Sequence, residues 1–128
     1  LVMFIVREGN AIGWRASVPT REPIERLSLP LGGISALQAA HDSGLTYLGP
    51  SPSPARPIEA TLWAALGAEP PPLEMLVVPV LVKQRPVNLV YAHTLGGTPP
   101  QTLVTELQDL AARAQTAYLR LIRQTRGS

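Results

Sequence analysis

The segment from Leu76 to Leu95, LVVPVLVKQRPVNLVYAHTL, decides the fold of this chain. Its two runs, 76–82 and 87–95, are rich in β-branched and aromatic residues, and the polar residues 83–86 between them favour a turn. The segment therefore predicts a β-hairpin. Both alternating faces of the first run are apolar, so we expect this strand to lie inside a sheet that is covered on both sides.

Further strands are expected earlier in the chain. Residues 1–8 and 11–18 are β-prone runs separated by Gly9 and Asn10, which predicts a second hairpin, with Gly13 marking a weak point or a bulge. Residues 26–31, RLSLPL, alternate as a half-buried strand does, and Pro30 indicates that this strand is an edge or is ending. Residues 45–48 favour a brief fourth strand before the proline-rich loop 49–57, GPSPSPARP.

Three helices are expected. The first ends at Asp42 with Gly44 as its stop, and the second follows Pro57 and covers residues 58–66. The third opens near Thr98 and runs to Gln124. Helices and hairpins without a regular βαβ alternation predict an α+β fold: an antiparallel sheet of five or six strands, short helices, and the long C-terminal helix packed on one face.

Length and composition restrict the protein class. The 128 residues fit a single domain, 1–128, and 11 basic against 9 acidic side chains give a net charge of +2, too small and too scattered to predict a nucleic-acid partner. The chain contains no cysteine, which excludes disulfides and thiolate chemistry and fits a reducing cytoplasm. The apolar runs are far below the roughly 20 residues that span a bilayer, so no membrane partner is expected. The chain does not begin with methionine, and we expect it to be a fragment of a longer protein whose other domains are its partners.

The sequence offers no catalytic motif. It lacks the G-x-S-x-G elbow and both glycine-rich phosphate loops, and its two histidines, His41 and His93, have no further ligand-type residue at helix or strand spacing apart from Asp42. We therefore expect neither catalytic residues, nor a metal, nor a cofactor, and predict that the chain is not an enzyme.

Several aromatic and polar residues are candidates for a ligand site between the sheet and the segment 47–63. Aromatic side chains with a polar group suit a concave pocket, and an arginine suits an anionic ligand. The alternative is that they pack in the core or, for the arginine, lie in solvent. The candidates are Trp14, Tyr47, Arg56, Trp63, Tyr91 and His93.

The last helix carries an apolar stripe that is wider than a sheet needs. Its core alternates spacings of four and three, as an association seam does. The sequence therefore predicts contact with a second copy, giving a homodimer, or with a neighbouring domain; the alternative is that the stripe only completes the core. The candidate interaction residues are Leu107, Ala114, Tyr118, Leu121 and Ile122.

The order of elements resembles that of a GAF domain lacking its first helix. VVPVLVKQRPVNLVYAHT, residues 77–94, is similar to the GAF pattern of an apolar strand with a central proline, a tight turn and a returning strand, and LPLGGISALQAAHDSGLTYLG, residues 29–49, is similar to the segment where a GAF strand gives way to a helix. Asn88 and Leu89 stand where many GAF domains carry glycine, and the NKFDE motif of cyclic-nucleotide-binding members and the cysteine of bilin-binding members are absent. The resemblance implies a GAF-, PAS- or profilin-like fold and a regulatory module.

Two functions remain open from the sequence. The first is a non-enzymatic signalling or regulatory module that mediates protein–protein interaction or dimerisation. The second is a small-molecule sensor with its ligand between the sheet and residues 47–63. A roadblock- or PAS-like scaffold that forms dimers is a further alternative, with a different strand order.

Overall fold

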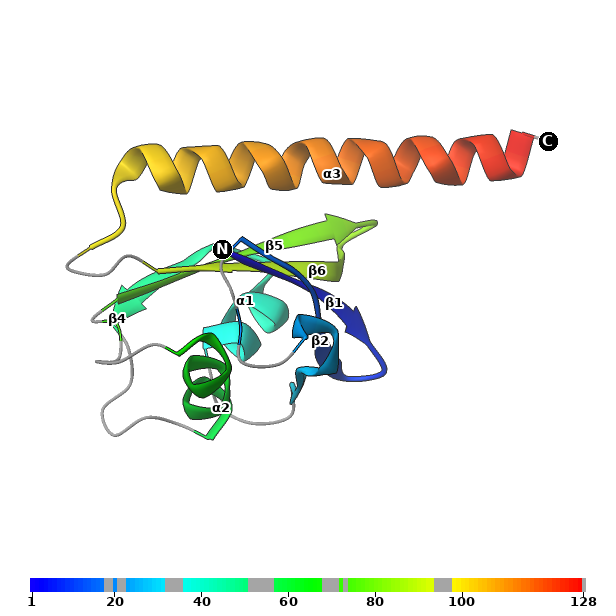
Figure 1. Ribbon diagram of the computed structural model, residues 1–128. Coiled ribbons are helices and arrows are strands. Elements are labelled where there is room, and N and C mark those ends of the chain that lie inside the picture. The colour runs from blue at the N-terminus through cyan, green and yellow to red at the C-terminus, as the bar shows by residue number, and fades with distance from the viewer. Residues whose placement is uncertain are drawn as a thin grey trace.

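The computed structural model describes residues 1–17, 20, 23–31, 36–50, 57–67, 72, 74–93 and 98–127. It contains one antiparallel sheet and helices on both of its faces (Figure 1). The elements are β1 (Val2–Arg7), β2 (Asn10–Ala16), the 3-10 helix η1 (Ile24–Arg26), β3 (Ser28–Pro30), α1 (Ala36–Ser43), β4 (Tyr47–Pro50), α2 (Pro57–Leu66), β5 (Glu74–Val82), β6 (Arg85–Ala92) and α3 (Gln101–Gly127). The predicted α+β class with a long C-terminal helix on one face is confirmed.

The six strands have the order β3-β2-β1-β6-β5-β4, and all their pairings are antiparallel. The β5–β6 hairpin and β1 lie in the middle, as the apolar character of residues 76–82 predicts. The two edge strands are short, and each ends in a proline: β3 in Pro30 and β4 in Pro50. The prediction that Pro30 marks an edge is confirmed.

Both hairpin turns differ from the prediction: the first lies one residue earlier in the chain, and the second is two residues shorter. The first turn consists of Glu8 and Gly9, with φ of 53° and 78°, and Asn10 already pairs with Arg7. The central turn consists of Lys83 and Gln84 alone, both at positive φ, and residues 85 and 86 belong to β6. Two consecutive residues at positive φ form the type of turn whose twist matches that of the strands, and this local geometry decided the boundaries.

A bulge at Gly13 was predicted, and the register confirms an irregularity there. Phe4 faces Gly13 while Met3 faces Arg15, so Trp14 is the extra residue on β2. Gly13 also lies against η1: a Cβ at this position would stand 2.1 Å from the carbonyl oxygen of Ile24. The sequence alone gave no sign of this close approach.

The two faces of the sheet carry separate apolar cores. On one face α1, α2 and η1 cover side chains that include Phe4, Leu29, Val77, Leu89 and Tyr91. On the other face α3 covers Leu76, Val78, Val80 and Val90 with its own Val104, Leu107 and Ala111. The alternation along β5 therefore sends its side chains into two cores, which explains why that strand has no polar face.

Candidate functional site

A chain of three polar aromatic side chains crosses the core between α2 and β6. The indole Nε1 of Trp63 donates to the hydroxyl of Tyr91 at 3.0 Å, and this hydroxyl lies 2.8 Å from Nδ1 of His93. Because an indole N–H can only donate, the Tyr91 oxygen accepts from Trp63, and its own O–H is free to donate to an unprotonated Nδ1. Burial raises the pKa of Tyr91 and lowers the pKa of His93, so both groups favour their neutral forms.

Tyr47 lies on the same sheet face but outside this chain. Strand register places it in one row with Val77 and Tyr91. Its hydroxyl, however, donates to the carbonyl oxygen of Pro50 at 2.9 Å, and burial raises its pKa. Tyr47 therefore packs beside the chain without joining its hydrogen bonds.

Glu59 is a buried carboxylate that the sequence analysis missed. Its side chain is 2% exposed, and its Oε1 accepts from the backbone N–H of Ala36, the first residue of α1, at 2.7 Å. Its Oε2 is buried and has no hydrogen-bond partner among the described residues. Glu59 stands one turn before Trp63 on α2, so this spacing within an apolar helix was the available signal.

The structure does not bring all the predicted ligand residues together. Trp63, Tyr91 and His93 meet, with Tyr47 beside them. Trp14 is on the other face: Gly13 faces η1, so Trp14 turns towards the α3 side, where it is 42% exposed with the Arg15 guanidinium 5.4 Å from its ring centroid. Alternation along β2 sets this direction, because Gly13 lies on one face and Ile12 and Trp14 lie on the other.

Arg56 lies outside the described residues. A cavity of about 330 Å³ lies on the far side of α2 from Tyr91, between that helix and η1. It is lined by Pro23, Ile24, Arg26, Leu27, Thr61, Ala64 and Ala65, none of which was a candidate from the sequence.

The interaction residues expected on α3 divide between the core and the surface. Leu107 is buried, and the Tyr118 hydroxyl donates to Oδ1 of Asn88 at 2.7 Å. Asn88 is itself buried and donates to the carbonyl oxygen of Phe4, so Tyr118 is tied to the sheet. Ala114 and Ile122 are half-buried, and Leu121 is 59% exposed.

The long helix carries a heptad pattern whose apolar line does not point straight at the sheet. We call this line the seam: Leu103, Leu107, Leu110, Ala114, Ala117 and Leu121, spaced four and three residues apart. The residues that face the sheet most directly, the sheet column, are Val104, Ala111 and Tyr118. At about 100° per residue, the centre of the seam lies about 80° around the helix from the direction of the sheet. Leu107 is consequently buried, whereas Ala117 and Leu121 are exposed.

Side-chain hydrogen bonds fix which way the seam points. On the opposite flank of α3, Nε2 of Gln108 donates to the hydroxyl of Thr46, next to β4, and Oε1 of Gln115 accepts from the N–H of Leu81 in β5. Since β4 and β5 form one edge of the sheet, the seam points the other way, towards β1 and β2.

Beneath that side of α3, part of the sheet face is incompletely covered. We call it the open half-face: Met3 and Ile5 of β1 with Ile12 and Trp14 of β2. Ile5 pairs with both Ile12 and Asn88, and Asn88 contacts Tyr118, which places this row on the α3 side. Met3, Ile5 and Ile12 are only half-buried, because α3 packs chiefly against β5.

Comparison with protein-family models found no match, and comparisons with curated proteins and with solved structures found none either. The GAF resemblance therefore remains a prediction from the sequence. Within the described ranges, no helix is both long and apolar enough to cross a bilayer, and no group of three or more His, Asp or Glu side chains is placed to hold a metal ion.

Proposed function

We propose that the chain is a non-enzymatic regulatory module that binds another polypeptide through α3. The observation that carries this proposal is the offset of the seam from the sheet. The sheet of this chain buries Leu107, whereas Ala117 and Leu121 on the same seam stay exposed. Burying one exposed leucine contributes about 1.5 to 3 kcal/mol, so a partner that covers this end of the seam gains substantial apolar contact. The partner is a second copy, another domain of the same protein or a separate protein.

The shape of the helix supports the proposal. Its 27 residues span about 40 Å, whereas the nine residues of β5 span about 30 Å. The C-terminal part of α3 extends beyond the end of the sheet (Figure 1). A helix that served only to complete the core would not need this extension. The resemblance to GAF domains and the absence of cysteine are consistent with a regulatory role in the cytoplasm.

Light scattering and site-directed cross-linking test the proposal. If the partner is a second copy, the intact chain should associate and a Leu121→Glu/Ile122→Lys variant should be monomeric, with Thr105→Glu/Thr116→Lys on the exposed side of α3 as the matched control. Because the chain has no cysteine, Ala117→Cys gives a single cross-linking position, to be compared with Thr105→Cys. A monomer at every concentration, with no cross-link from Ala117→Cys to a copy, to an adjoining domain or to a helical peptide, would remove the proposal.

A small-molecule sensor is the second candidate, and the polar chain from Trp63 to His93 supports it. Beside the chain, Glu59 keeps one carboxylate oxygen without a partner among the described residues. A ligand that binds only the native state raises the melting temperature, so melting against a panel of nucleotides and metabolites tests this function. The expected shift should disappear in Tyr91→Phe and persist in Thr61→Ala, on the opposite side of α2. A panel without any shift counts against a sensor.

A further inference from the structure

The seam of α3 and the open half-face together form one apolar surface, which we call the open apolar surface. One part is the seam from Leu110 to Leu121, of which Leu110 and Ala114 are half-buried and Ala117 and Leu121 are exposed. The other part is the half-buried row of β1 and β2. The hydrogen bonds of Gln108 and Gln115 place these two parts side by side, because they anchor the opposite flank of the helix. A single occupant can therefore contact both.

The width of the sheet indicates what occupies this surface. Neighbouring strands lie about 4.8 Å apart and a helix is about 10 Å wide, so one helix covers about two strands. The opposite face uses α1 over the β4 to β6 side and α2 with η1 over the β2 to β3 side. Among the residues that the structure describes, the α3 face has one helix, over β5, which leaves room for one more helix over β1 and β2.

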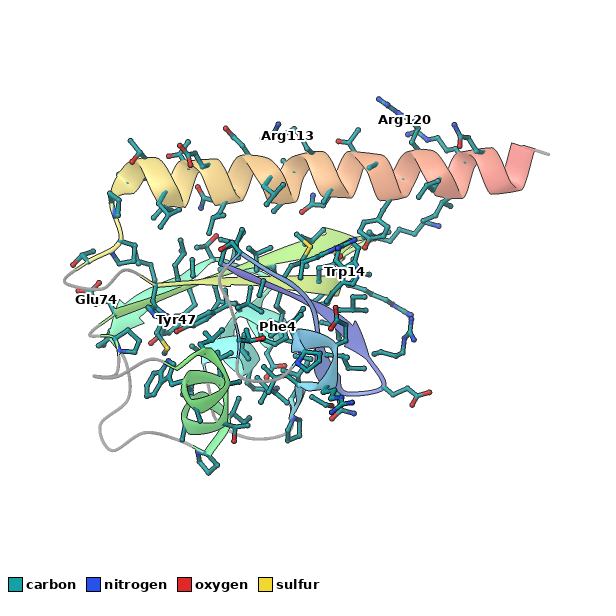
Figure 2. The ribbon with its side chains drawn as sticks, viewed as in Figure 1. Phe4, Trp14, Tyr47, Glu74, Arg113 and Arg120 are labelled. Atoms are coloured by element: carbon teal, nitrogen blue, oxygen red, sulfur yellow. The ribbon has the colours of Figure 1, made fainter. Side chains whose placement is uncertain are left out.

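The charges beside the seam restrict the chemistry of that helix. Residues seven apart form an outer column on the solvent side of the seam: Glu106, Arg113 and Arg120. Figure 2 shows Arg113 and Arg120 directed away from the sheet. Within the described residues neither has an ion-pair partner, and Nε of Arg113 donates to the carbonyl oxygen of Asp109 in its own helix. In paired helices, positions flanking the seam meet the flanking positions of the partner.

We infer that the open apolar surface binds a single amphipathic helix of another polypeptide, with acidic side chains placed against Arg113 and Arg120. This inference rests on the proposed function and narrows its partner. A second copy fits this position poorly, because its α3 carries its own sheet, and that sheet would occupy the same space as the open half-face. A helix without an attached sheet meets no such obstacle.

Two fluorescein-labelled peptides of about 21 residues test the inference with the full chain. In each of their three heptads, both peptides carry leucine at the two seam positions and isoleucine at the position that faces the sheet. At the outer position, one peptide has glutamate and the other has lysine. By fluorescence anisotropy at low salt we expect the glutamate peptide to bind about tenfold more tightly, because two flanking pairs change from repulsive to attractive. The advantage should shrink at about 300 mM salt.

Charge reversal gives the decisive variant. Arg113→Glu/Arg120→Glu should reverse the preference in favour of the lysine peptide, whereas Arg26→Glu/Arg123→Glu, with the same change in net charge away from the open apolar surface, should keep it. Ala117→Glu and Ile12→Thr should each weaken both peptides at least about tenfold, with circular dichroism checking the fold.

Failure of both peptides to bind, equal binding of the two, or an unchanged preference after charge reversal would overturn the inference. If Ala117→Cys still cross-links two copies while neither peptide binds, the proposed function stands and the occupant is a second copy. If the cross-links are also absent, both proposals fail.

Discussion

Substitution of Gly13 by alanine should destabilise the fold through a steric clash. The added Cβ would stand 2.1 Å from the Ile24 carbonyl oxygen and 2.8 Å from Ile24 Cγ1, whereas ordinary contacts begin near 3.4 Å. η1 must then move away by more than 1 Å, which breaks the hydrogen bond from the Gly13 N–H to the carbonyl oxygen of Leu27, now 2.8 Å long. Because η1 consists of only three residues, we expect it to shift as a unit.

These contacts give the loss in the free energy of unfolding that Gly13→Ala should cause. Loss of the hydrogen bond contributes about 1 kcal/mol and partial exposure of Ile24, which is 7% exposed, contributes about 2 kcal/mol, giving about 3 kcal/mol in all. Gly9→Ala is the matched control: φ is +78° but nothing lies within 4 Å of the added carbon, so the expected cost is about 1 kcal/mol. Urea denaturation followed by circular dichroism measures both free energies of unfolding. A smaller loss for Gly13→Ala than for Gly9→Ala would refute the steric argument.

Three other predictions concern the core and its polar chain. Val80→Asp should unfold the domain, because it places an unpaired carboxylate at a position of 0% exposure, whereas Arg85→Asp beside the exposed turn should change the melting temperature little. A larger loss of melting temperature for Arg85→Asp than for Val80→Asp would contradict the assignment of the buried strand and the turn. Tyr91→Phe leaves the buried Trp63 N–H without its acceptor and should cost about 1 to 3 kcal/mol in urea titrations, and a neutral result would show that the bond carries no net stability. The lowered pKa of His93 means that the folded state binds fewer protons than the unfolded state, so this contribution to stability is present above about pH 6.5 and is lost as the pH falls below it; melting at several pH values should show this loss in the native chain and a weaker one in His93→Asn.

Much of the fold could be predicted because it depends on periodicity and on chain-breaking residues. Gly44 and Gly67 end α1 and α2 at φ of 69° and 66°, within one residue of the predicted limits. The start of α3 was predicted near Thr98, but Pro100 provides the carbonyl that accepts from the N–H of Leu103, and the helix begins at Gln101. The prolines therefore precede the helix.

The candidate site was harder to predict, because residues distant in the sequence build it. Tyr91 and His93 share a face by simple alternation, and Trp63 joins them only because α2 crosses that face. Glu59 was missed because a carboxylate in an amphipathic helix ordinarily lies in solvent, and its acceptance of the Ala36 N–H depends on where α1 begins. Trp14 was assigned to the wrong face because the sequence did not show which face of β2 meets the short helices; alternation from Gly13, which faces η1, places Trp14 with Ile12 on the α3 side.

The prolines at the ends of β3 and β4 restrict how this domain can assemble. Pro30 and Pro50 have no N–H to donate, and the strands that carry them are three and four residues long. A foreign strand that approached either edge would find few hydrogen bonds to form, so the sheet resists growth by strand addition and the fibrous aggregation that such growth begins. Association is then directed to side-chain surfaces, where specificity depends on shape and charge and single substitutions can change it.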